Sequence, residues 1–515
     1  MKTLSSVVFG DTPLSIEQVA AIAVHGRHCQ LSTADNFVKK IQEGTDFLDN
    51  MLSEDGVIYG VTTGYGDSCT RAVPVEQAYE LPIHLSRFHG CGLGKHLDPI
   101  ATRSVMAVRL ASLTRGVSGV SKELLDLLVV MLNANILPLI PEEGSVGASG
   151  DLTPLSYVAA ALIGERDVLY KGERRPTKDV FDELGITPLT MRPKEALAIM
   201  NGTAVMTGLA VLAFERSEYL VKMASRLTAL TSIAMKGNPQ HFDEFLFAAK
   251  PHPGQNMVAA WIRSDLDTGQ QDEQPDRLQD RYSIRCAPHV IGVLQDMLPT
   301  FRQMIEIELN SANDNPIIDT AEGRVLHGGH FYGGHIAFVM DSMKNLVANV
   351  ADLIDRQMAL LVDVKFNNGL PSNLSGATGD RAPLNHGLKA VQIGVSAWTA
   401  EALKNTMPAS VFSRSTECHN QDKVSMGTIA ARDCIRNLDL TNQVIAGHMI
   451  ATCQAIALRL RDGGIQPSNL NPELRTFLDD VQKTVPFIDE DKPLEGVLRA
   501  LIDQLNDQSW SLYTD

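Results

Sequence analysis

The stretch GSVGASGDLTP, residues 144–154, contains a tripeptide, Ala148-Ser149-Gly150, that could do chemistry on its own backbone. A backbone amide can attack the carbonyl two residues earlier only where the chain bends tightly and nothing blocks the nitrogen. Glycine at position 150 removes the obstructing Cβ, and the serine can then lose water to leave an exocyclic methylene. The product would be a five-membered ring carrying a strong electrophile, made without an added cofactor.

The same stretch also has an ordinary structural interpretation. Clusters of glycine and serine usually mark turns, so the tripeptide alone is a weak signal. Thr153 suits the N-cap of a helix and Pro154 its first position. The sequence therefore predicts a helix that opens at Pro154 and continues through LSYVAAALIGE.

Several further blocks carry a resemblance to a known family. The segment GSVGASGDLTPLSYVAAALIGE resembles the signature of the aromatic amino acid and histidine ammonia-lyases, in which the tripeptide cyclises to methylideneimidazolone (MIO). The resemblance continues, in family order, through VIYGVTTGYG, MNGTAVMTG, QDRYSIRCAPHVIG, ELNSANDNPIID, HGGHFYGG and HNQDKVSMGT. It covers residues 57 to about 430 and implies that MIO forms from Ala148, Ser149 and Gly150, with no external cofactor.

Elimination of ammonia from an amino acid requires an electrophile that captures the amine and a base that reaches the β-carbon. The resemblance assigns the base to Tyr59, in the block IYG. A free phenol has a pKa of about 10, so nearby positive charge or hydrogen bonds must hold Tyr59 partly as phenolate. The alternative is a core tyrosine on a strand, and VIYGVTTG is one of the few local strand signals. The flanking glycines favour a loop that can close over a substrate.

The substrate carboxylate calls for a fork of hydrogen-bond donors, which arginine provides best. Arg285 matches the family arginine in this role, and Asn315 matches its amide partner. Tyr282, which we count among the catalytic candidates, and Gln279 precede Arg285 by three and six residues. On a helix or turn this spacing places all three side chains roughly on one side.

Two other residues are assigned to the surroundings of the ring by the resemblance alone. Asn201, in MNGT, matches the family asparagine close to MIO, and Phe331, in HGGHFYGG, matches an aromatic residue that packs beside it. Taken singly, each of these polar or aromatic residues would more often be a cap or a salt-bridge partner than part of a site.

Phe88 and His89 lie at a pair of positions that indicates which substrate side chain is accepted. Phenylalanine lyases typically have Phe-Leu at this pair, many tyrosine lyases His-Leu and histidine lyases Ser-His, so this chain departs from all three. Phe88 offers an apolar wall for an aryl ring, and His89 could bond a phenolic hydroxyl because an unpaired buried imidazole is costly. Alternatively, protein or water satisfies His89.

Three further positions bear on the same question. By the resemblance, histidine lyases have a glutamate at the position that matches Gln421. A neutral glutamine there argues against histidine as substrate. Leu152 is expected to be an apolar pocket wall. Glu417 aligns with a carboxylate that plant phenylalanine lyases carry near the amine.

These residues predict an ammonia-lyase that converts an aromatic L-amino acid, tyrosine in preference to phenylalanine, to p-coumarate or cinnamate. A tyrosine or phenylalanine 2,3-aminomutase is an alternative that the motifs do not separate. Histidine ammonia-lyase is a further alternative. An inactive helical-bundle binding protein is the alternative of a different class, disfavoured by the intact tripeptide and Tyr59.

Long helices must position these residues. Apolar residues recur with helical spacing over 98–116 and 122–140, and segments 201–235, 333–363 and about 426–461 could each form one very long helix. Helices that are apolar on nearly all sides must pack against each other or against other subunits. We therefore expect a mainly α fold, a fumarase/aspartase-like bundle of long central helices. Its predicted parts are an N-terminal domain (1–200) bearing the substrate loop and MIO, the central bundle (201–465) and a C-terminal helical cap (466–515).

Bulk composition excludes several classes of partner. The net charge of −16 disfavours nucleic acid and anionic membranes. Seven scattered cysteines without a CxxC pair, and an N-terminus too weakly apolar for a signal peptide, predict a reduced cytoplasmic protein. No metal is expected, because the histidines lack ligand spacing. The resemblance implies a homotetramer whose active sites draw residues from three chains.

Overall fold

The chain folds into a mainly helical structure that contains two compact units. The computed structural model describes residues 6–53, 57–268 and 277–513. The first unit comprises Met1–Glu215, Phe301–Asp341 and Pro408–Arg432. The second unit comprises Arg216–Thr300, Ser342–Met407 and Asp433–Asp515. Each unit is therefore assembled from segments that are distant in sequence, and the domain boundaries expected at residues 200 and 465 stay predictions.

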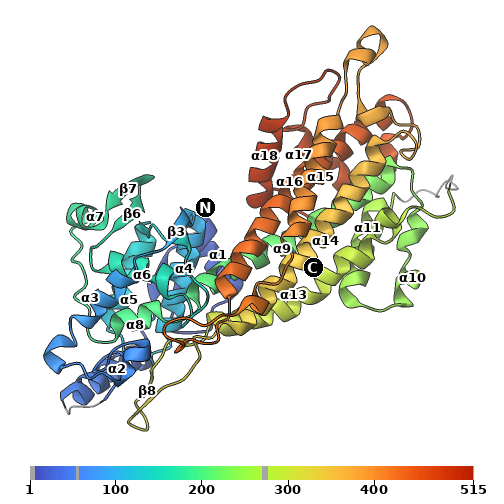
Figure 1. Cartoon of the computed structure of the whole chain (residues 1–515). Helices are drawn as coiled ribbons and strands as arrows, with labels where there is room; N and C mark the ends of the chain where they lie inside the picture. Colours follow the sequence, from blue (N-terminus) through green and yellow to red (C-terminus); the bar gives the residue numbers. More distant parts are fainter. Residues whose placement is uncertain (1–5, 54–56, 269–276, 514–515) are drawn as a thin grey trace. The chain divides into compact units, whose positions relative to one another are not determined.

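The long helices expected from the sequence are present. They are α9 (Ala204–Ala234), α14 (Gly334–Val362) and α16 (Gly427–Arg461), accompanied by α13 (Ala287–Leu309). Figure 1 labels all four. The helices α9, α14 and α16 begin and end within three residues of the expected bounds, because apolar residues cover almost the whole circumference of each.

The first unit is built around α4, which is buried along nearly its whole length. The Asp98 side chain accepts a hydrogen bond from the Ala101 amide (2.8 Å) and Pro99 occupies the first turn, so the start of α4 is well specified. Helices α1 and α5 pack against α4. The helices that begin in this unit are α1 (Ile16–His25), α2 (Asp35–Ser53), α3 (Leu81–Phe88), α4 (Pro99–Leu113), α5 (Lys122–Asn133), α6 (Leu152–Leu162), α7 (Thr177–Leu184), α8 (Glu195–Met200), α9, α14 and α16, and the last three continue into the second unit.

Small sheets complete the first unit. Strands β1 and β2 are parallel; the pairs β3–β5 and β8–β9 and the three strands β4–β6–β7 are antiparallel. Their bounds are β1 (Val7–Phe9), β2 (Cys29–Leu31), β3 (Leu93–His96), β4 (Leu137–Pro138), β5 (Pro141–Glu143), β6 (Asp167–Tyr170), β7 (Glu173–Pro176), β8 (Ile317–Asp319) and β9 (Arg324–Leu326).

Two segments depart from their local helix and strand signals. The helix expected over 122–140 ends at Asn133, because Asn135 adopts a positive φ of 55° and Pro138 disfavours helix in the residue before it. The segment VIYGVTTG, for which a strand was the alternative to the favoured loop, is a turn, in which the amides of Val61 and Thr62 both donate to the Ile58 carbonyl. Gly60, at φ 67°, reverses the chain there.

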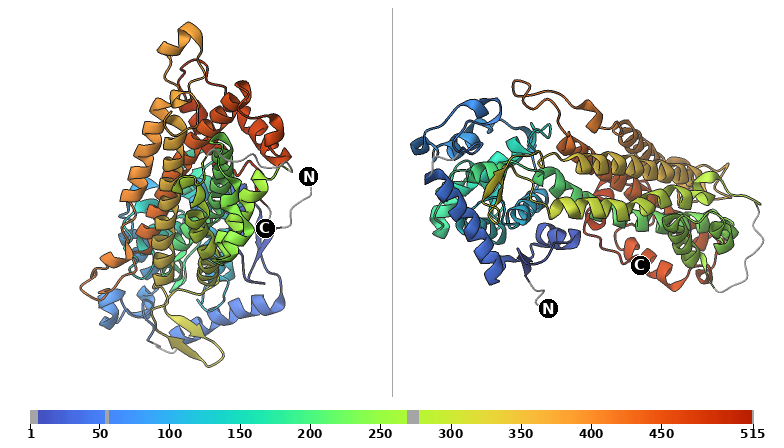
Figure 2. Two further views of the ribbon diagram at one scale, coloured as in Figure 1. Left: turned by 90° about the vertical axis from the view of Figure 1, so that its right-hand side faces the viewer. Right: turned by 90° about the horizontal axis from the view of Figure 1, so that it is seen from below.

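The second unit is a bundle of helices tied together by buried polar contacts. In Figures 1 and 2, α9, α14 and α16 run along one another through this unit. Gln357 of α14 donates to the Thr228 hydroxyl of α9 (2.9 Å), and His448 of α16 lies 2.8 Å from the Thr231 hydroxyl. Burial lowers the pKa of His448 to about 3. The ring is therefore neutral and part of the core.

The remaining helices of the second unit surround this bundle. They are α10 (Glu244–Ala248), α11 (Pro253–Leu266), α12 (Tyr282–Arg285), α15 (Lys389–Lys404), α17 (Pro472–Gln482) and α18 (Glu495–Asn506). Short 3-10 turns occur in both units, at η1 (Gly66–Thr70), η2 (Val75–Gln77), η3 (Pro239–Phe242), η4 (Ser372–Leu374), η5 (Gly379–Leu384), η6 (Ser410–Phe412) and η7 (Pro467–Asn469).

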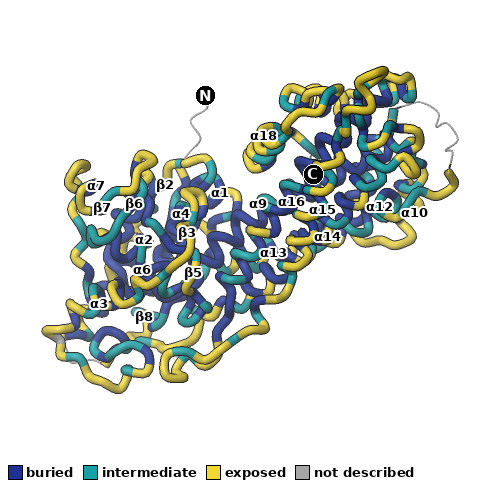
Figure 3. The backbone as a smooth tube through the Cα atoms, turned by 45° about the horizontal axis from the view of Figure 1, so that its top comes forward, coloured by how far each residue is buried: buried dark blue, intermediate teal, exposed yellow. Residues whose placement is uncertain are grey.

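Burial follows the long helices, as Figure 3 shows by its dark segments. Polar residues inside α9 satisfy their hydroxyls locally: Ser225, Thr228 and Thr231 each donate to the carbonyl four residues earlier. Within the described ranges, none of the helices has the length and apolar character needed to cross a membrane.

Candidate active site

The tripeptide lies in a tight turn between β5 and α6. Ser149 has a φ of 51° and Gly150 a φ of 79°, so two consecutive residues adopt the left-handed conformation. A Cβ on residue 150 would collide with the carbonyl group of Gly202, which faces it across an isolated parallel bridge. Glycine is therefore required at position 150 both by conformation and by space.

Every polar atom of Ser149 except its amide has a defined partner. Its carbonyl oxygen accepts hydrogen bonds from the Gly202 amide (3.1 Å) and the Asn201 side-chain amide (3.0 Å). Its hydroxyl oxygen accepts from the Gln421 side-chain amide (3.0 Å). In contrast, the Gly150 amide donates to no acceptor in the described parts of the chain. The turn thus holds the serine while leaving the following nitrogen uncommitted.

Asp151, which the sequence did not single out, anchors this turn. Its buried carboxylate accepts from the Ser145 hydroxyl (3.0 Å), the Thr428 hydroxyl and the amides of Val205 and Met206 (3.0 Å each). Burial raises the pKa of Asp151, and these hydrogen bonds act in the opposite direction. The carboxylate therefore caps the start of α9.

The helix start predicted at Thr153 and Pro154 was wrong by two residues. Helix α6 begins at Leu152, with Asp151 at its N-cap position and no side-chain capping bond. The reason is that the capping carboxylate is already engaged by the amides at the start of α9. Leu152 is half-buried in the first turn of α6.

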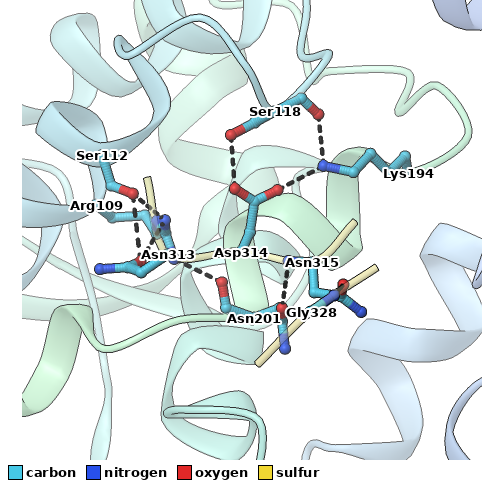
Figure 4. Close-up of polar contacts among 9 residues, drawn as sticks. All are labelled: Arg109, Ser112, Ser118, Lys194, Asn201, Asn313, Asp314, Asn315 and Gly328. Atoms are coloured by element: carbon cyan, nitrogen blue, oxygen red, sulfur yellow. Dashed lines mark hydrogen bonds and ion pairs between the residues drawn. The ribbon is translucent and has the colours of Figure 1, made fainter. Parts of the chain in front are cut away.

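Asn201 and Asn315 are brought together by a hydrogen bond. The Asn315 amide donates to the Asn201 side-chain oxygen (2.7 Å), and the Asn315 side-chain oxygen accepts from the Gly328 amide (2.8 Å) (Figure 4). Asn315 therefore connects the loop after α8 to the segment that carries Phe331, which is half-buried.

A buried ion pair fixes the loop that precedes Asn315. Lys194 and Asp314 are fully buried, with 2.5 Å between Nζ and Oδ2. Lys194 also donates to the Ser118 carbonyl (2.6 Å), and the Ser118 hydroxyl donates to Asp314 (2.7 Å) (Figure 4). Removing one member would leave an unpaired buried charge, which is strongly destabilising.

Tyr59 lies in the turn region 57–66. Its hydroxyl oxygen accepts from the Gly66 amide (2.7 Å), and its ring meets His327 edge to face at 6.5 Å. Burial raises the pKa of Tyr59, the Gly66 amide lowers it, and the charge of Glu417 raises it further. The Glu417 carboxylate accepts from the neighbouring Asp67 amide (3.0 Å). The positive charge expected to activate Tyr59 is not supplied by the described residues of this unit.

Phe88 and His89 lie together at the end of α3. Their rings are 4.6 Å apart, Phe88 is 59% exposed, and the His89 carbonyl accepts from the Ser156 hydroxyl of α6 (3.2 Å). Burial, with a contribution from Arg166, lowers the pKa of His89 to about 4. The imidazole is therefore neutral at ordinary pH and can donate or accept a hydrogen bond.

The three residues predicted to bind the carboxylate belong to the second unit. Arg285 stacks over the Tyr282 ring (4.7 Å) and approaches the Gln279 side-chain oxygen (3.4 Å), so the prediction that they share one side is confirmed. Arg285 also donates to the Asp280 carbonyl (3.0 Å), while Tyr282 is 72% exposed. This cluster thus belongs to the second unit, whereas Tyr59 and Ser149 belong to the first.

All seven cysteines are free thiols. Among the described residues, no three His, Cys, Asp or Glu side chains are grouped so that they could hold a metal ion.

The chain resembles known proteins over nearly its whole length. The family profile for aromatic amino acid lyase matches residues 14–483. A histidine ammonia-lyase of Geobacillus is 33% identical over 511 residues, covering 98% of both chains. The human histidine ammonia-lyase is 34% identical and covers 90% of this chain and 71% of its own.

Solved structures with the same fold include enzymes of other names. A tyrosine aminomutase from Streptomyces globisporus has a TM-score of 0.90 at 32% identity, covering 98% of this chain and 97% of its own. A phenylalanine aminomutase from Pantoea agglomerans has a TM-score of 0.89 at 30% identity, with coverage of 98% and 99%. A histidine ammonia-lyase from Trypanosoma cruzi has a TM-score of 0.88 at 27% identity, with coverage of 98% and 94%.

Proposed function

This chain belongs to the aromatic amino acid lyase family, and we propose that it eliminates ammonia from an aromatic L-amino acid, with L-tyrosine preferred over L-phenylalanine. The products are p-coumarate and cinnamate. The observation that carries the proposal is the turn at Ala148–Gly150, where Ser149 is held by three hydrogen bonds and the Gly150 amide has no acceptor among the described residues.

The turn fits the formation of MIO from the chain itself. The Gly150 nitrogen adds to the Ala148 carbonyl carbon, and that oxygen leaves as water with the amide hydrogens of Gly150 and Ser149. Ser149 then loses its Cα hydrogen and its hydroxyl as a second water, which creates the methylene. Glycine at 150 and the positive φ angles of Ser149 and Gly150 support this closure.

MIO supplies the electrophile that captures the substrate amine and makes it a leaving group. The Asn201 side chain and the Gly202 amide hold the oxygen of residue 149 in place. Tyr59 removes the β-proton at its hydroxyl oxygen, which the Gly66 amide orients. Its raised pKa calls for a cation that the described residues of this unit do not supply.

A homotetramer with shared sites would supply that cation. In this proposal Arg285 of a neighbouring chain binds the substrate carboxylate, assisted by Asn315, while Tyr282 and Gln279 line the same place. The exposure of Tyr282 and the open donors of Arg285 support a role toward a ligand or a second chain.

The residues assigned to the substrate side chain favour a phenol. Gln421 is neutral, and its amide donates to Ser149 while its oxygen accepts from Thr416 (3.1 Å), so it offers no charge to an imidazolium. The neutral His89 can bond a phenolic hydroxyl, and Phe88 and Leu152 provide apolar walls. Phe331 packs beside the ring, and Glu417 lies toward the amine in this arrangement.

Two alternative activities are each favoured by a specific observation. Histidine ammonia-lyase activity is favoured by the names of the curated relatives at 33–34% identity. A 2,3-aminomutase activity, in which the amine returns to the β-carbon, is favoured by the solved tyrosine and phenylalanine aminomutases.

One experiment separates these outcomes. Purified protein is incubated with L-tyrosine, L-phenylalanine or L-histidine, and p-coumarate, cinnamate, urocanate, β-amino acids and ammonia are measured. We expect p-coumarate to form fastest, together with a peptide spanning 148–150 that has lost two water molecules. Urocanate alone would make the protein a histidine lyase, and β-tyrosine appearing before p-coumarate would make it a mutase. No product and an intact peptide would overturn the proposal.

A further inference from the structure

Arg109 is a buried cation that the chemistry described so far does not use. It lies on α4, is 0% exposed and is the largest fully buried side chain in the described chain. Its guanidinium donates to the Asn201 carbonyl (2.8 Å), the Ser112 hydroxyl (2.6 Å) and the Asn313 side-chain oxygen (3.1 Å) (Figure 4). All these partners are neutral.

No carboxylate pairs directly with this guanidinium among the described residues. Burial lowers the pKa of Arg109 to about 10, and the more distant Asp314 and Asp151 act in the opposite direction. The side chain therefore remains charged at neutral pH. Its Nε atom is buried without an acceptor. A cation buried without a counter-ion is costly, so its presence calls for a compensating role.

One peptide unit links Arg109 to the tripeptide. The Asn201 carbonyl accepts from Arg109, and the amide of the same peptide group, at Gly202, donates to the Ser149 carbonyl (3.1 Å). The Asn201 side chain donates to the same Ser149 oxygen (3.0 Å). A cation at the carbonyl end of a peptide group polarises its N–H, and hydrogen bonds in such a chain strengthen one another.

The groups between Arg109 and Ser149 are packed too closely to admit even a Cβ atom. A Cβ on residue 202 would collide with Arg109 and with the Asn313 side-chain oxygen, and a Cβ on residue 150 would collide with the Gly202 carbonyl. Gly202 has a φ of 139°. Arg109 therefore packs directly against the 201–202 peptide group, and that peptide group packs directly against the Ser149 turn.

The Ser149 carbonyl oxygen is where charge gathers as the tripeptide matures. When the Cα hydrogen of Ser149 leaves as a proton, its electron pair delocalises onto this oxygen before it forms the bond to Cβ. The Cβ–Oγ bond then breaks, and the hydroxyl departs with the proton as water. Donors that are fixed in advance at a developing oxyanion accelerate such a step.

We infer that Arg109 is a positioning residue which, through the 201–202 peptide group, stabilises the negative charge on the Ser149 carbonyl and so accelerates the dehydration that forms the electrophile. This inference rests on the proposed function, because it concerns the maturation of the same tripeptide. It assigns a role in making the electrophile to a residue that does not touch the substrate.

The test measures maturation directly, by the mass of the peptide spanning 148–150 in a pulse–chase time course. We expect Arg109→Met to slow the loss of water by on the order of 10²-fold, and Arg109→Lys to lie between it and the wild type. Arg459→Met is the matched control. Arg459 is also buried and donates to the carbonyls of Ala234, Asn367 and Asn368, all in the second unit.

Asn313→Asp tests the charge of Arg109 while leaving the Arg109 side chain in place. It places a carboxylate oxygen at the atom that now accepts from Arg109 (3.1 Å), so it neutralises the guanidinium, while its second oxygen replaces the nitrogen that donates to the Thr203 hydroxyl (2.8 Å). We expect maturation to slow in the folded variant by more than in Thr203→Ala, which removes the same contact without adding charge. A purely structural role for Arg109 predicts normal maturation here, and that result would overturn the inference.

The remaining outcomes are also decisive. Equal maturation rates in folded Arg109→Met and the wild type would contradict the inference while leaving the proposed function intact. If Arg109→Met does not fold, Asn313→Asp and Arg109→Lys carry the test. An unmodified peptide in the wild type itself would instead refute the proposed function.

Discussion

The turn at Ala148–Gly150 and the segment Gln279–Arg285 carry two different parts of the proposed chemistry, and they differ in how far the chain satisfies their polar groups. Around the turn, the Ser149 carbonyl and hydroxyl and the Asp151 carboxylate all have partners. In the segment, Tyr282 is 72% exposed and the approach of Arg285 to Gln279 is a long 3.4 Å.

This difference indicates which part of the proposed site is complete within a single chain. A reaction between backbone atoms needs fixed geometry, so the Ser149 carbonyl and hydroxyl are held by hydrogen bonds that leave the reacting nitrogen uncommitted. A guanidinium that must bind a carboxylate has to keep donors open until the ligand arrives. We therefore expect the turn to act within one chain and the segment to act toward a ligand held by another.

The largest effect is expected at the turn. Ser149→Ala removes the hydroxyl that leaves as water, so no methylene forms, and turnover should fall by on the order of 10³-fold or more. Thermal unfolding should stay close to that of the wild type, because the carbonyl keeps its two donors. Ser53→Ala, at an exposed hydroxyl that donates to the Asn50 carbonyl, is the control. Wild-type turnover in Ser149→Ala would refute the self-made electrophile.

The next largest effect is expected at Tyr59 and Arg285, and combining the two variants tests whether these residues act in different chains. Tyr59→Phe should lower kcat by about 10²–10⁴-fold, and Arg285→Met should mainly raise KM. When the two variants are co-expressed in equal amounts, random mixing gives about a quarter of the shared sites both native residues. Activity of the mixture should recover to that level. A mixture no more active than its components would show that both residues serve a site within one chain.

A smaller effect is expected on selectivity within the first unit. His89→Leu removes the neutral imidazole that we assign to the phenolic hydroxyl, so the ratio of kcat/KM for tyrosine to that for phenylalanine should fall by about 10- to 100-fold. Phe88, beside it, should be left in place. An unchanged ratio would mean that Ser156 and other protein groups, rather than substrate, occupy the surroundings of His89.

The smallest effect concerns the pH dependence of Tyr59. Its base form is the phenolate, so kcat/KM should rise with pH through the pKa of this residue. Burial raises that pKa and the charge of Glu417 raises it further. Glu417→Gln removes the charge while its amide oxygen can still accept from Asp67, so the rising limb should move toward lower pH. A shift toward higher pH would contradict the placement of Glu417 beside Tyr59.

Much of the fold could be predicted from the sequence because its signals are local. The long helices followed from apolar residues on nearly every face, and the grouping of Gln279, Tyr282 and Arg285 followed from their spacing. The local strand signal failed at VIYGVTTG, where Gly60 makes a turn, and the helix prediction failed at 134–140, where Asn135 ends the helix. In both places one backbone conformation outweighed a short apolar pattern.

The amino-acid sequence by itself determined the atoms available for cyclisation, Ala148, Ser149 and Gly150, and the order of the family blocks around them. Only the tertiary structure decided what surrounds those atoms. The partners of Ser149 are 52 and 272 residues away in the chain, and Arg109 reaches Asn201 across 92 residues. A charged residue inside the apolar pattern of 98–116 was the one signal that could have pointed to Arg109. Its role depends on contacts that exist only once α4 and the loop after α8 have packed together.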